Sequence, residues 1–273
     1  MATGDSQRAV RWLPKPVIIS APFGNYVRPS GATPTVGTFT AHRRRGRWHR
    51  VLATVRHVPR LGAWVNRIGL RNPGIGWMEA RVASGKVTLG ESIVSVHGFR
   101  EEEWRDLIRR VAALRPGAIE LNVSCPNVGE LSWPIWLFAE AEAALPGRVI
   151  VKIPPVRFEA MVRDALSAGV RMFHCCNTLP VPGGGMSGKP LMPLSLIAIG
   201  RVRAMAREMG IDEGSVLIIG GGGITEPADV DAYADAGAMR VAIGTKLMHP
   251  KYLWSDAGVR GIIARAAERF GSS

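Results

Sequence analysis

The sequence predicts an α/β protein, a (β/α)8 TIM barrel, and three observations lead to this prediction. From about residue 90 onward, short β-branched apolar runs alternate with helix-like segments, which is typical of a parallel sheet with crossover helices. The length of 273 residues is close to the ~250 residues usual for this barrel. No linker, repeat or low-complexity segment divides the chain, so we expect a single domain over residues 1–273.

Eight strands can be placed in order, two in the N-terminal third and six after it. They are expected at Val17–Ser20, Thr35–Thr40, Ser92–Val96, Ala118–Val123, Val149–Ile153, Arg171–Cys176, Val216–Gly220 and Arg240–Gly244. The expected helices are Glu101–Leu114, Pro134–Ala144, Phe158–Ala168, Leu194–Met209, Glu226–Ala236 and Ala257–Phe270. Eight parallel strands with outer helices close into a barrel through right-handed connections. The segment Gly46–Trp77 is too long and too rich in Arg and Gly for a simple crossover helix, so we expect an Arg-rich excursion, at about 41–77, over one end of the barrel.

The positive charge is concentrated in the N-terminal third. Between Ser6 and Met78 there is no acidic residue, and this window holds thirteen Lys and Arg residues, which equals the whole net charge of +13. Such a stretch indicates an anionic partner, which could be a nucleic acid, an anionic membrane surface, an acidic protein, or the carboxylate or phosphate of a ligand. A solvated face in an arginine-rich protein explains it equally well.

The sequence indicates a cytoplasmic protein without a transmembrane segment. Its longest apolar runs, such as Val216–Ile219, are far shorter than the ~20 residues of a membrane-spanning helix, and the N-terminus lacks the apolar core of a signal peptide. Three cysteines, of which Cys175 and Cys176 are adjacent, cannot form a disulfide framework. His42, His49 and His57 lack metal-ligand spacing and have cationic neighbours, so no zinc site is expected.

Glycines follow the seventh and eighth strands, at the barrel face where catalytic residues gather. In the run Gly220–Gly223 the backbone can approach a ligand and turn N–H groups toward oxygen anions. The positive end of the helix that begins near Glu226, together with Gly244 and Thr245, would complete a phosphate site. The alternative explanation is a tight turn with a helix cap.

Two further features follow the fifth and sixth strands. Lys152 ends a buried strand among apolar residues, and an inward lysine needs a charge or a strong acceptor, which favours an electron-rich ligand atom. The glycine-rich stretch 182–189, which includes Gly188, indicates a mobile loop or one that contacts a ligand, although a flexible linker has the same composition.

Asparagines gather at the same predicted face: Asn66, Asn72, Asn122, Asn127 and Asn177. Each amide carries donors and an acceptor side by side, which complements a cyclic imide or amide such as a pyrimidine ring. A single asparagine is explained as well by a cap on a turn, but several together are not.

Cys125 lies between Ser124 and Pro126 in this amide-rich turn. A thiol near a flavin or an electrophile can act as general acid or base, nucleophile or redox partner. A small buried hydrophobic residue is the alternative, and it is our interpretation of Cys175 and Cys176.

Taken in order, these motifs resemble the dihydroorotate dehydrogenase family. They are Asn122-Val-Ser-Cys-Pro-Asn127, Val151-Lys-Ile-Pro154, Asn177-Thr178, Gly184-Gly-Met-Ser-Gly188, Ile219-Gly-Gly-Gly-Gly-Ile224 and Ile243-Gly-Thr245, and Asn66-Arg-Ile-Gly-Leu-Arg-Asn72 extends the match backward. The resemblance implies an FMN-containing barrel that oxidises (S)-dihydroorotate to orotate in pyrimidine biosynthesis. A base would take a proton from ring C5, and a hydride would pass from C6 to flavin N5.

The resemblance also implies residue roles. Cys125 takes the position of the base, which is cysteine in the soluble class 1 enzymes and serine in the membrane-associated class 2, so class 1 is implied. The implied substrate ligands are Asn66, Asn122, Asn127, Asn177 and Thr178. The implied FMN ligands are Lys152 at the flavin ring and Gly188, Gly222, Gly223, Gly244 and Thr245, the last four at the phosphate. The chain departs from the family after the second strand, where Thr38 stands near the place of a usual lysine; Arg67 or Arg71 could compensate by binding a substrate carboxylate.

Two alternatives keep part of this interpretation. The tRNA dihydrouridine synthases also use an FMN barrel with a Cys-Pro turn, and a basic third suits RNA, but nucleic acid is not favoured because the loops after Asn177 resemble the first family. The other alternative is a flavin-binding relative that lost activity with the lysine and docks a partner through its basic face. We expect a small dihydropyrimidine substrate and a homo-oligomer. An electron-transfer partner subunit is one route to reoxidise the flavin, beside fumarate, quinone and oxygen.

Overall fold

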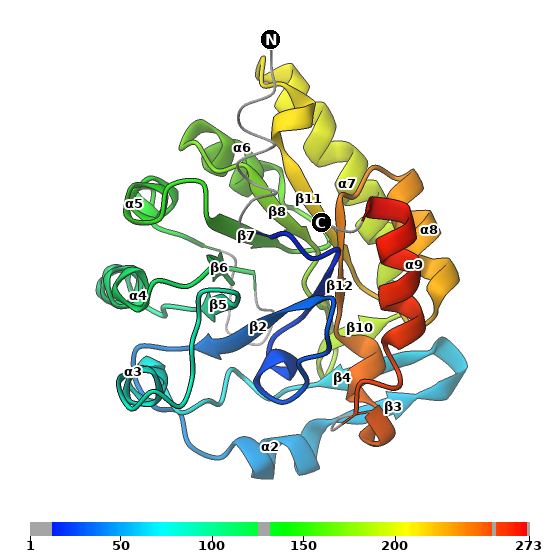
Figure 1. Ribbon diagram of the computed structural model, residues 1–273, viewed down its shortest axis with the longest axis horizontal. Coiled ribbons are helices and arrows are strands. Elements are labelled where there is room, and N and C mark those ends of the chain that lie inside the picture. Colours follow the sequence, from blue (N-terminus) through cyan, green and yellow to red (C-terminus); the bar gives the residue numbers. More distant parts are fainter. Residues whose placement is uncertain (1–12, 125–131, 253–254, 272–273) are drawn as a thin grey trace.

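A closed barrel of eight strands forms the centre of the computed structural model, which describes residues 13–124, 132–252 and 255–271 (Figure 1). The order around the barrel is β1-β12-β11-β8-β7-β6-β5-β2, and all neighbours are parallel. The strands are β1 (Val17–Ile19), β2 (Ala32–Phe39), β5 (Ile93–Val96), β6 (Ala118–Leu121), β7 (Val149–Ile153), β8 (Met172–Cys175), β11 (Leu217–Gly221) and β12 (Arg240–Ile243). The predicted fold class is confirmed, and each predicted strand is present within a few residues of its expected bounds.

Helices surround the barrel as its outer layer (Figure 1). They are α3 (Ile75–Ala83), α4 (Glu101–Leu114), α5 (Leu137–Ala144), α6 (Glu159–Ser167), α7 (Leu191–Glu208), α8 (Pro227–Asp235) and α9 (Arg260–Phe270). The first connection carries only the 3-10 turn η1 (Phe23–Asn25) between β1 and β2. Among the helices of the described residues, none is both long and apolar enough to cross a membrane.

The barrel interior changes from apolar to polar along the strands. Alternate residues of a strand point to the same side, so the interior positions can be followed in steps of two. At the amino-terminal end these positions hold an apolar cluster that includes Ile93, Ala118, Ile150 and Met172. Two residues further along the same strands come Ser95, Glu120, Lys152 and His174, all buried. On these four strands the interior positions are therefore apolar at the amino-terminal end and polar toward the carboxyl-terminal face of the barrel.

The segment between β2 and α3 folds into short helices and strands beside the carboxyl-terminal face of the barrel. It contains α2 (Arg47–Thr54), β3 (Arg56–Val58), η2 (Pro59–Leu61) and β4 (Ala63–Asn66). β4 pairs antiparallel with β10 (Gly184–Gly188), which pairs with β9 (Leu179–Val181), giving a second sheet of order β3-β4-β10-β9 along the lower edge of Figure 1. The stretch 182–189, interpreted as a loop from its glycines, therefore contains a strand. Glycine is needed there because a Cβ at Gly184 or Gly188 would collide with the backbone of Asn66 or Gly62.

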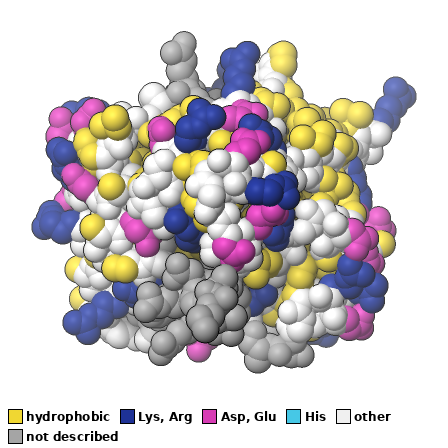
Figure 2. All heavy atoms as spheres, turned by 90° about the horizontal axis from the view of Figure 1, so that it is seen from above, with side chains coloured by type: hydrophobic (Ala, Val, Ile, Leu, Met, Phe, Trp, Pro, Cys, Tyr) yellow, Lys and Arg dark blue, Asp and Glu magenta, His cyan; other side chains and the backbone are white. Residues whose placement is uncertain are grey.

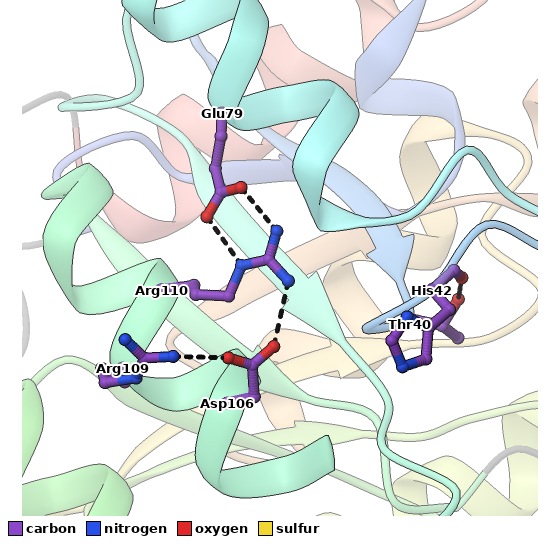
Figure 3. A network of polar contacts seen from close by, with 6 residues as sticks. All are labelled: Thr40, His42, Glu79, Asp106, Arg109 and Arg110. Atoms are coloured by element: carbon purple, nitrogen blue, oxygen red, sulfur yellow. Dashed lines mark hydrogen bonds and ion pairs between the residues drawn. The ribbon is translucent and has the colours of Figure 1, made fainter.

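Ion pairs join neighbouring outer helices. Arg110 of α4 donates to both carboxylate oxygens of Glu79 on α3, at 2.7 and 2.5 Å, and at 3.0 Å to Asp106, which also accepts from Arg109 at 2.7 Å (Figure 3). The guanidinium of Arg110 lowers the pKa of the Glu79 carboxyl. On the face shown in Figure 2, cationic and anionic side chains are likewise interspersed. This contrasts with the acid-free N-terminal third, where cations have no acidic neighbours along the chain.

Candidate active site

A cavity of about 320 Å³ lies where the barrel strands end. The barrel contributes one part of its wall, including Thr38, Asn122, Lys152, His174, Asn177, Thr178, Gly222 and Gly244. The segment after β2 contributes the other part, including Arg47, Trp48, Val51, Val55, Asn66 and Arg71. The volume is that of a site for a small organic ligand. The predicted residues Asn66, Asn122, Asn177, Thr178, Lys152, Gly222 and Gly244 thus share one cavity.

The buried amides at the cavity wall are bonded to one another. Asn177 Nδ2 donates to Asn122 Oδ1 at 2.8 Å and to Ser124 Oγ at 3.1 Å, and Asn122 Nδ2 donates to Thr38 Oγ1 at 3.0 Å. Ser124 Oγ in turn donates to the backbone oxygen of Lys152 at 2.6 Å. These bonds link β2, β6, β7 and β8, so the amide groups are held in fixed positions before any ligand arrives.

Three charged or titratable side chains form the layer beneath the amides. His174 Nδ1 donates to Glu120 Oε2 at 2.8 Å, and Lys152 is the register neighbour of His174 on the adjacent strand. Burial opposes ionisation of Glu120, but the Lys152 ammonium and the bond from His174 outweigh it and lower the pKa of the carboxyl to about 2. Burial and the nearby Lys152 charge lower the pKa of His174. The group is therefore a carboxylate, an ammonium and a neutral imidazole, whose charges balance.

Sequence reasoning missed Glu120 and His174. The signal was available, because Glu120 stands two residues before Asn122 and must face the same side of the strand. Glu120 also bears on the burial of Lys152, because its carboxylate is close enough to interact electrostatically with the lysine inside the protein.

The predicted phosphate glycines differ in their surroundings. Gly222 and Gly244 line the cavity. Gly223 packs against β10, because a Cβ there would lie 2.8 Å from the backbone oxygen of Gly188. Thr245 is buried at the start of the short 3-10 helix η4 (Thr245–Met248).

The first turn of α8 is already capped by the chain's own carboxylates. Asp229 Oδ2 accepts from the backbone N–H groups of Thr225 at 2.7 Å and Glu226 at 3.0 Å, and Lys189 donates to Asp229 Oδ1. The N-terminal N–H groups of α8, which we expected to face a phosphate, are therefore already bonded to the chain's own carboxylates, and of the predicted phosphate residues Gly222 and Gly244 line the cavity.

Cys125 and Asn127 lie outside the described residues. The other two cysteines are buried in and after β8, and burial raises the pKa of both thiols, that of Cys176 to about 11. They stay protonated at neutral pH, as expected for small hydrophobic residues. Among the described residues, no group of three His, Cys, Asp or Glu side chains could hold a metal ion.

The charged side chains that line the cavity, among the residues that the structure describes, are all cationic. They are Arg47, Arg71 and Lys152, and these lining residues include no Asp or Glu. The described part of the wall therefore suits an anionic ligand.

The family model for dihydroorotate dehydrogenase matches residues 29–264. The chain belongs to the dihydroorotate dehydrogenase family. This confirms the resemblance predicted from the motifs, and it places the chain among oxidoreductases that act on a CH–CH bond. The site described above is thus the candidate active site of a dihydroorotate dehydrogenase family member.

Curated relatives in this family are similar over about two thirds of their length. The catalytic subunit of dihydroorotate dehydrogenase B (NAD(+)) from Lachnoclostridium phytofermentans is 30% identical over 217 residues, 69% of this chain and 70% of that protein. The same subunit from Exiguobacterium sibiricum is 32% identical over 207 residues, 66% of this chain and 64% of that protein. Dihydroorotate dehydrogenase A (fumarate) from Lactobacillus helveticus is 29% identical over 213 residues, 66% of each chain.

Solved structures of the family share the fold. The Eimeria tenella enzyme in complex with ferulenol superimposes with a TM-score of 0.75 at 19% identity, covering 93% of this chain and 80% of that one. Its ligand-free form gives a TM-score of 0.69 at 20% identity, with 88% and 78% covered. At this identity the likeness supports the barrel fold alone.

Proposed function

We propose that the protein is an FMN-dependent oxidoreductase of the class 1 dihydroorotate dehydrogenase type, which converts (S)-dihydroorotate to orotate. The observation that carries the proposal is the set of three asparagine amides, from Asn66, Asn122 and Asn177, in one cation-lined cavity. Amides match the alternating N–H and C=O groups of a dihydropyrimidine ring, and cations match its carboxylate.

The residues at the cavity fit FMN. A Cβ placed on Gly244 would meet only Ser20, at 3.5 Å, so the glycine leaves room on the cavity side that a phosphate can use. Gly222, Gly223, Gly244 and Thr245 would hold this phosphate, and Lys152 would contact the flavin ring, with Gly188 in the supporting strand. Bound FMN would supply the two-electron acceptor for oxidation of the CH–CH bond.

The chain's own groups have separate tasks in this proposal. Asn66, Asn122, Asn127, Asn177 and Thr178 would orient the substrate ring. Cys125 would take the ring proton, as a general base must when a carbon acid is oxidised. Ser124, one residue before it, is fixed by its bonds to Asn177 and to the Lys152 backbone, so the residue that precedes Cys125 is held in place.

The test is the absorption spectrum of the purified protein before and after anaerobic addition of dihydroorotate. We expect flavin bands that bleach on addition. Flavin bands that persist with dihydroorotate but bleach with dihydrouracil would show that the substrate is an uncharged dihydropyrimidine. A colourless protein that takes up no FMN would refute the proposal.

A pair of variants ties the flavin to the proposed pocket. Gly244→Val is expected to fold and to lose FMN, because its side chain can be accommodated by the protein but occupies cavity space. Gly200→Val on the exposed face of α7, where a Cβ meets nothing within 4 Å, is the control and should stay yellow. Steady-state assays with fumarate and with NAD(+), alone or with a partner subunit, then identify the electron acceptor.

A further inference from the structure

Arg71 stands in a loop whose backbone is fixed on both sides of it. The neighbouring Asn72 is buried; its Oδ1 accepts from the N–H of Gly74 at 2.8 Å and of Thr40 at 3.2 Å, and its Nδ2 donates to the Leu70 oxygen at 2.7 Å. The amide of Asn72, which the sequence suggested as a cavity amide, therefore forms its hydrogen bonds within the protein. These bonds hold the backbone next to Arg71 in place at the cavity wall.

The guanidinium of Arg71 keeps most of its donors free. Among the described residues its one hydrogen bond runs from Nη1 to the Arg45 backbone oxygen, at 3.2 Å, and it forms no ion pair. Its Nε–H is buried and has no partner in the described structure. A buried charged donor without an acceptor is costly, so its presence at a cavity wall indicates an acceptor supplied by a ligand.

A second cation, Arg44, lies close enough to Arg71 to be repelled by it. Arg44 lies over the Phe99 ring, 4.3 Å from its centroid, and its Nε–H is also buried without a partner in the described structure. Burial, and then repulsion by Arg71, lower the pKa of Arg44, although Glu103 opposes this effect. Two neighbouring cations with an incomplete set of acceptors are stabilised by an anion placed beside them.

The other cations at the cavity are already engaged. Glu120 balances the charge of Lys152 from below. Arg47 lies over the rings of Tyr26 and Trp48, with centroids 5.3 and 5.8 Å away. Arg67, which the sequence offered as an equal candidate, has an exposed side chain and does not line the cavity.

We propose that Arg71, supported by Arg44, is a carboxylate-binding site that makes the cavity select anionic over uncharged dihydropyrimidines. The inference rests on the proposed function, and it assigns to an arginine the charge that Thr38 cannot supply. A guanidinium binds a carboxylate through two parallel N–H bonds, and the unpartnered Nε of Arg71 belongs to such a pair.

The experiment compares orotate with uracil, which lacks the carboxylate, as ligands of the FMN-loaded protein in calorimetric titrations. Arg71→Gln is expected to weaken orotate binding by about 10- to 100-fold, the usual loss for a charged hydrogen bond, and to leave uracil binding unchanged. Arg71→Lys keeps the charge without the planar fork, so it should weaken orotate binding less. Arg67→Gln, four residues away and exposed, is the matched control and should bind both ligands as wild type does.

Equal weakening of both ligands, or of neither, in Arg71→Gln would overturn the inference. Thermal melting of each variant identifies one that fails to fold, in which case Arg71→Lys decides: unchanged orotate affinity in that variant rejects the paired-bond geometry. Failure of the proposed function is separate, since wild-type flavin would then not bleach with dihydroorotate, whereas failure of this inference leaves bleaching intact and insensitive to Arg71→Gln.

Discussion

The buried pair of Glu120 and Lys152 makes a quantitative prediction about stability and pH. Glu120→Gln keeps the shape of the side chain and imitates its protonated form. The folded protein lowers the carboxyl pKa from the usual 4.5 to about 2, and at about 1.4 kcal/mol for each pKa unit the ionised carboxylate adds about 3 kcal/mol to the free energy of unfolding. A group whose pKa is lowered by folding stabilises above its unfolded pKa, and this contribution is lost as pH falls from about 4.5 to about 2.

The assay is urea denaturation of wild type and Glu120→Gln at several pH values. The free energy of unfolding should differ by about 3 kcal/mol at pH 6 and by about 1 kcal/mol at pH 3, because at pH 3 the carboxyl is already protonated in the unfolded chain while it is still mostly ionised in the folded protein. Other carboxylates titrate in both proteins and cancel in the difference. A difference that is independent of pH, or below about 1 kcal/mol at pH 6, would show that Glu120 does not neutralise Lys152 in the folded state.

Three further predictions concern the candidate site and the strand that supports it. Cys125→Ala should retain FMN and slow flavin reduction by dihydroorotate by roughly 10²- to 10⁴-fold in stopped flow, the loss typical of a general base; an unchanged rate would remove Cys125 from that role. Asn177→Ala should raise the KM for dihydroorotate because it also releases Asn122, and a KM equal to wild type would contradict the idea of one connected amide network. Gly223→Ala should cost about 2 kcal/mol or more in urea denaturation, because φ is +77° and the Cβ would press on β10, whereas Gly200→Ala in α7 should be neutral or stabilising; equal midpoints for the two variants would refute the packing described for Gly223.

The barrel could be predicted because its strands are buried on both faces. Such strands appear in the sequence as mostly apolar runs, and α4 begins and ends at the predicted residues. The pairing of β4 with β10 could not be predicted in this way. It joins segments about 120 residues apart, and nothing in the local composition of 184–188 specifies a strand.

Within the site, the chemistry of a residue predicted its place at the cavity better than its position in the sequence predicted the direction of its side chain. Asn66, Asn122, Asn177, Lys152 and the cavity glycines could be assigned to the cavity because their chemistry is unusual at strand ends, whereas Asn127 lies outside the described residues. Asn72 lines the cavity as predicted, but its amide bonds to its own loop, and an amide of this kind has the same sequence signature as one that binds a ligand. The choice between Arg67 and Arg71 required the structure, since only the direction of each side chain separates them.

The pairing of β4 with β10 has a consequence for the order in which the chain acquires its binding cavity. The ribosome synthesises α2, β3 and β4 early, but β10, the strand that pairs with β4, is made only when residues 184–188 are added. Until then β3 and β4 are a short two-stranded ribbon, which is marginally stable in water. A ribosome-bound fragment that ends before Gly184 would therefore carry β1, β2, β5, β6, β7 and β8 of the barrel but only half of the second sheet, and the wall that this sheet gives to the cavity would be completed late in folding.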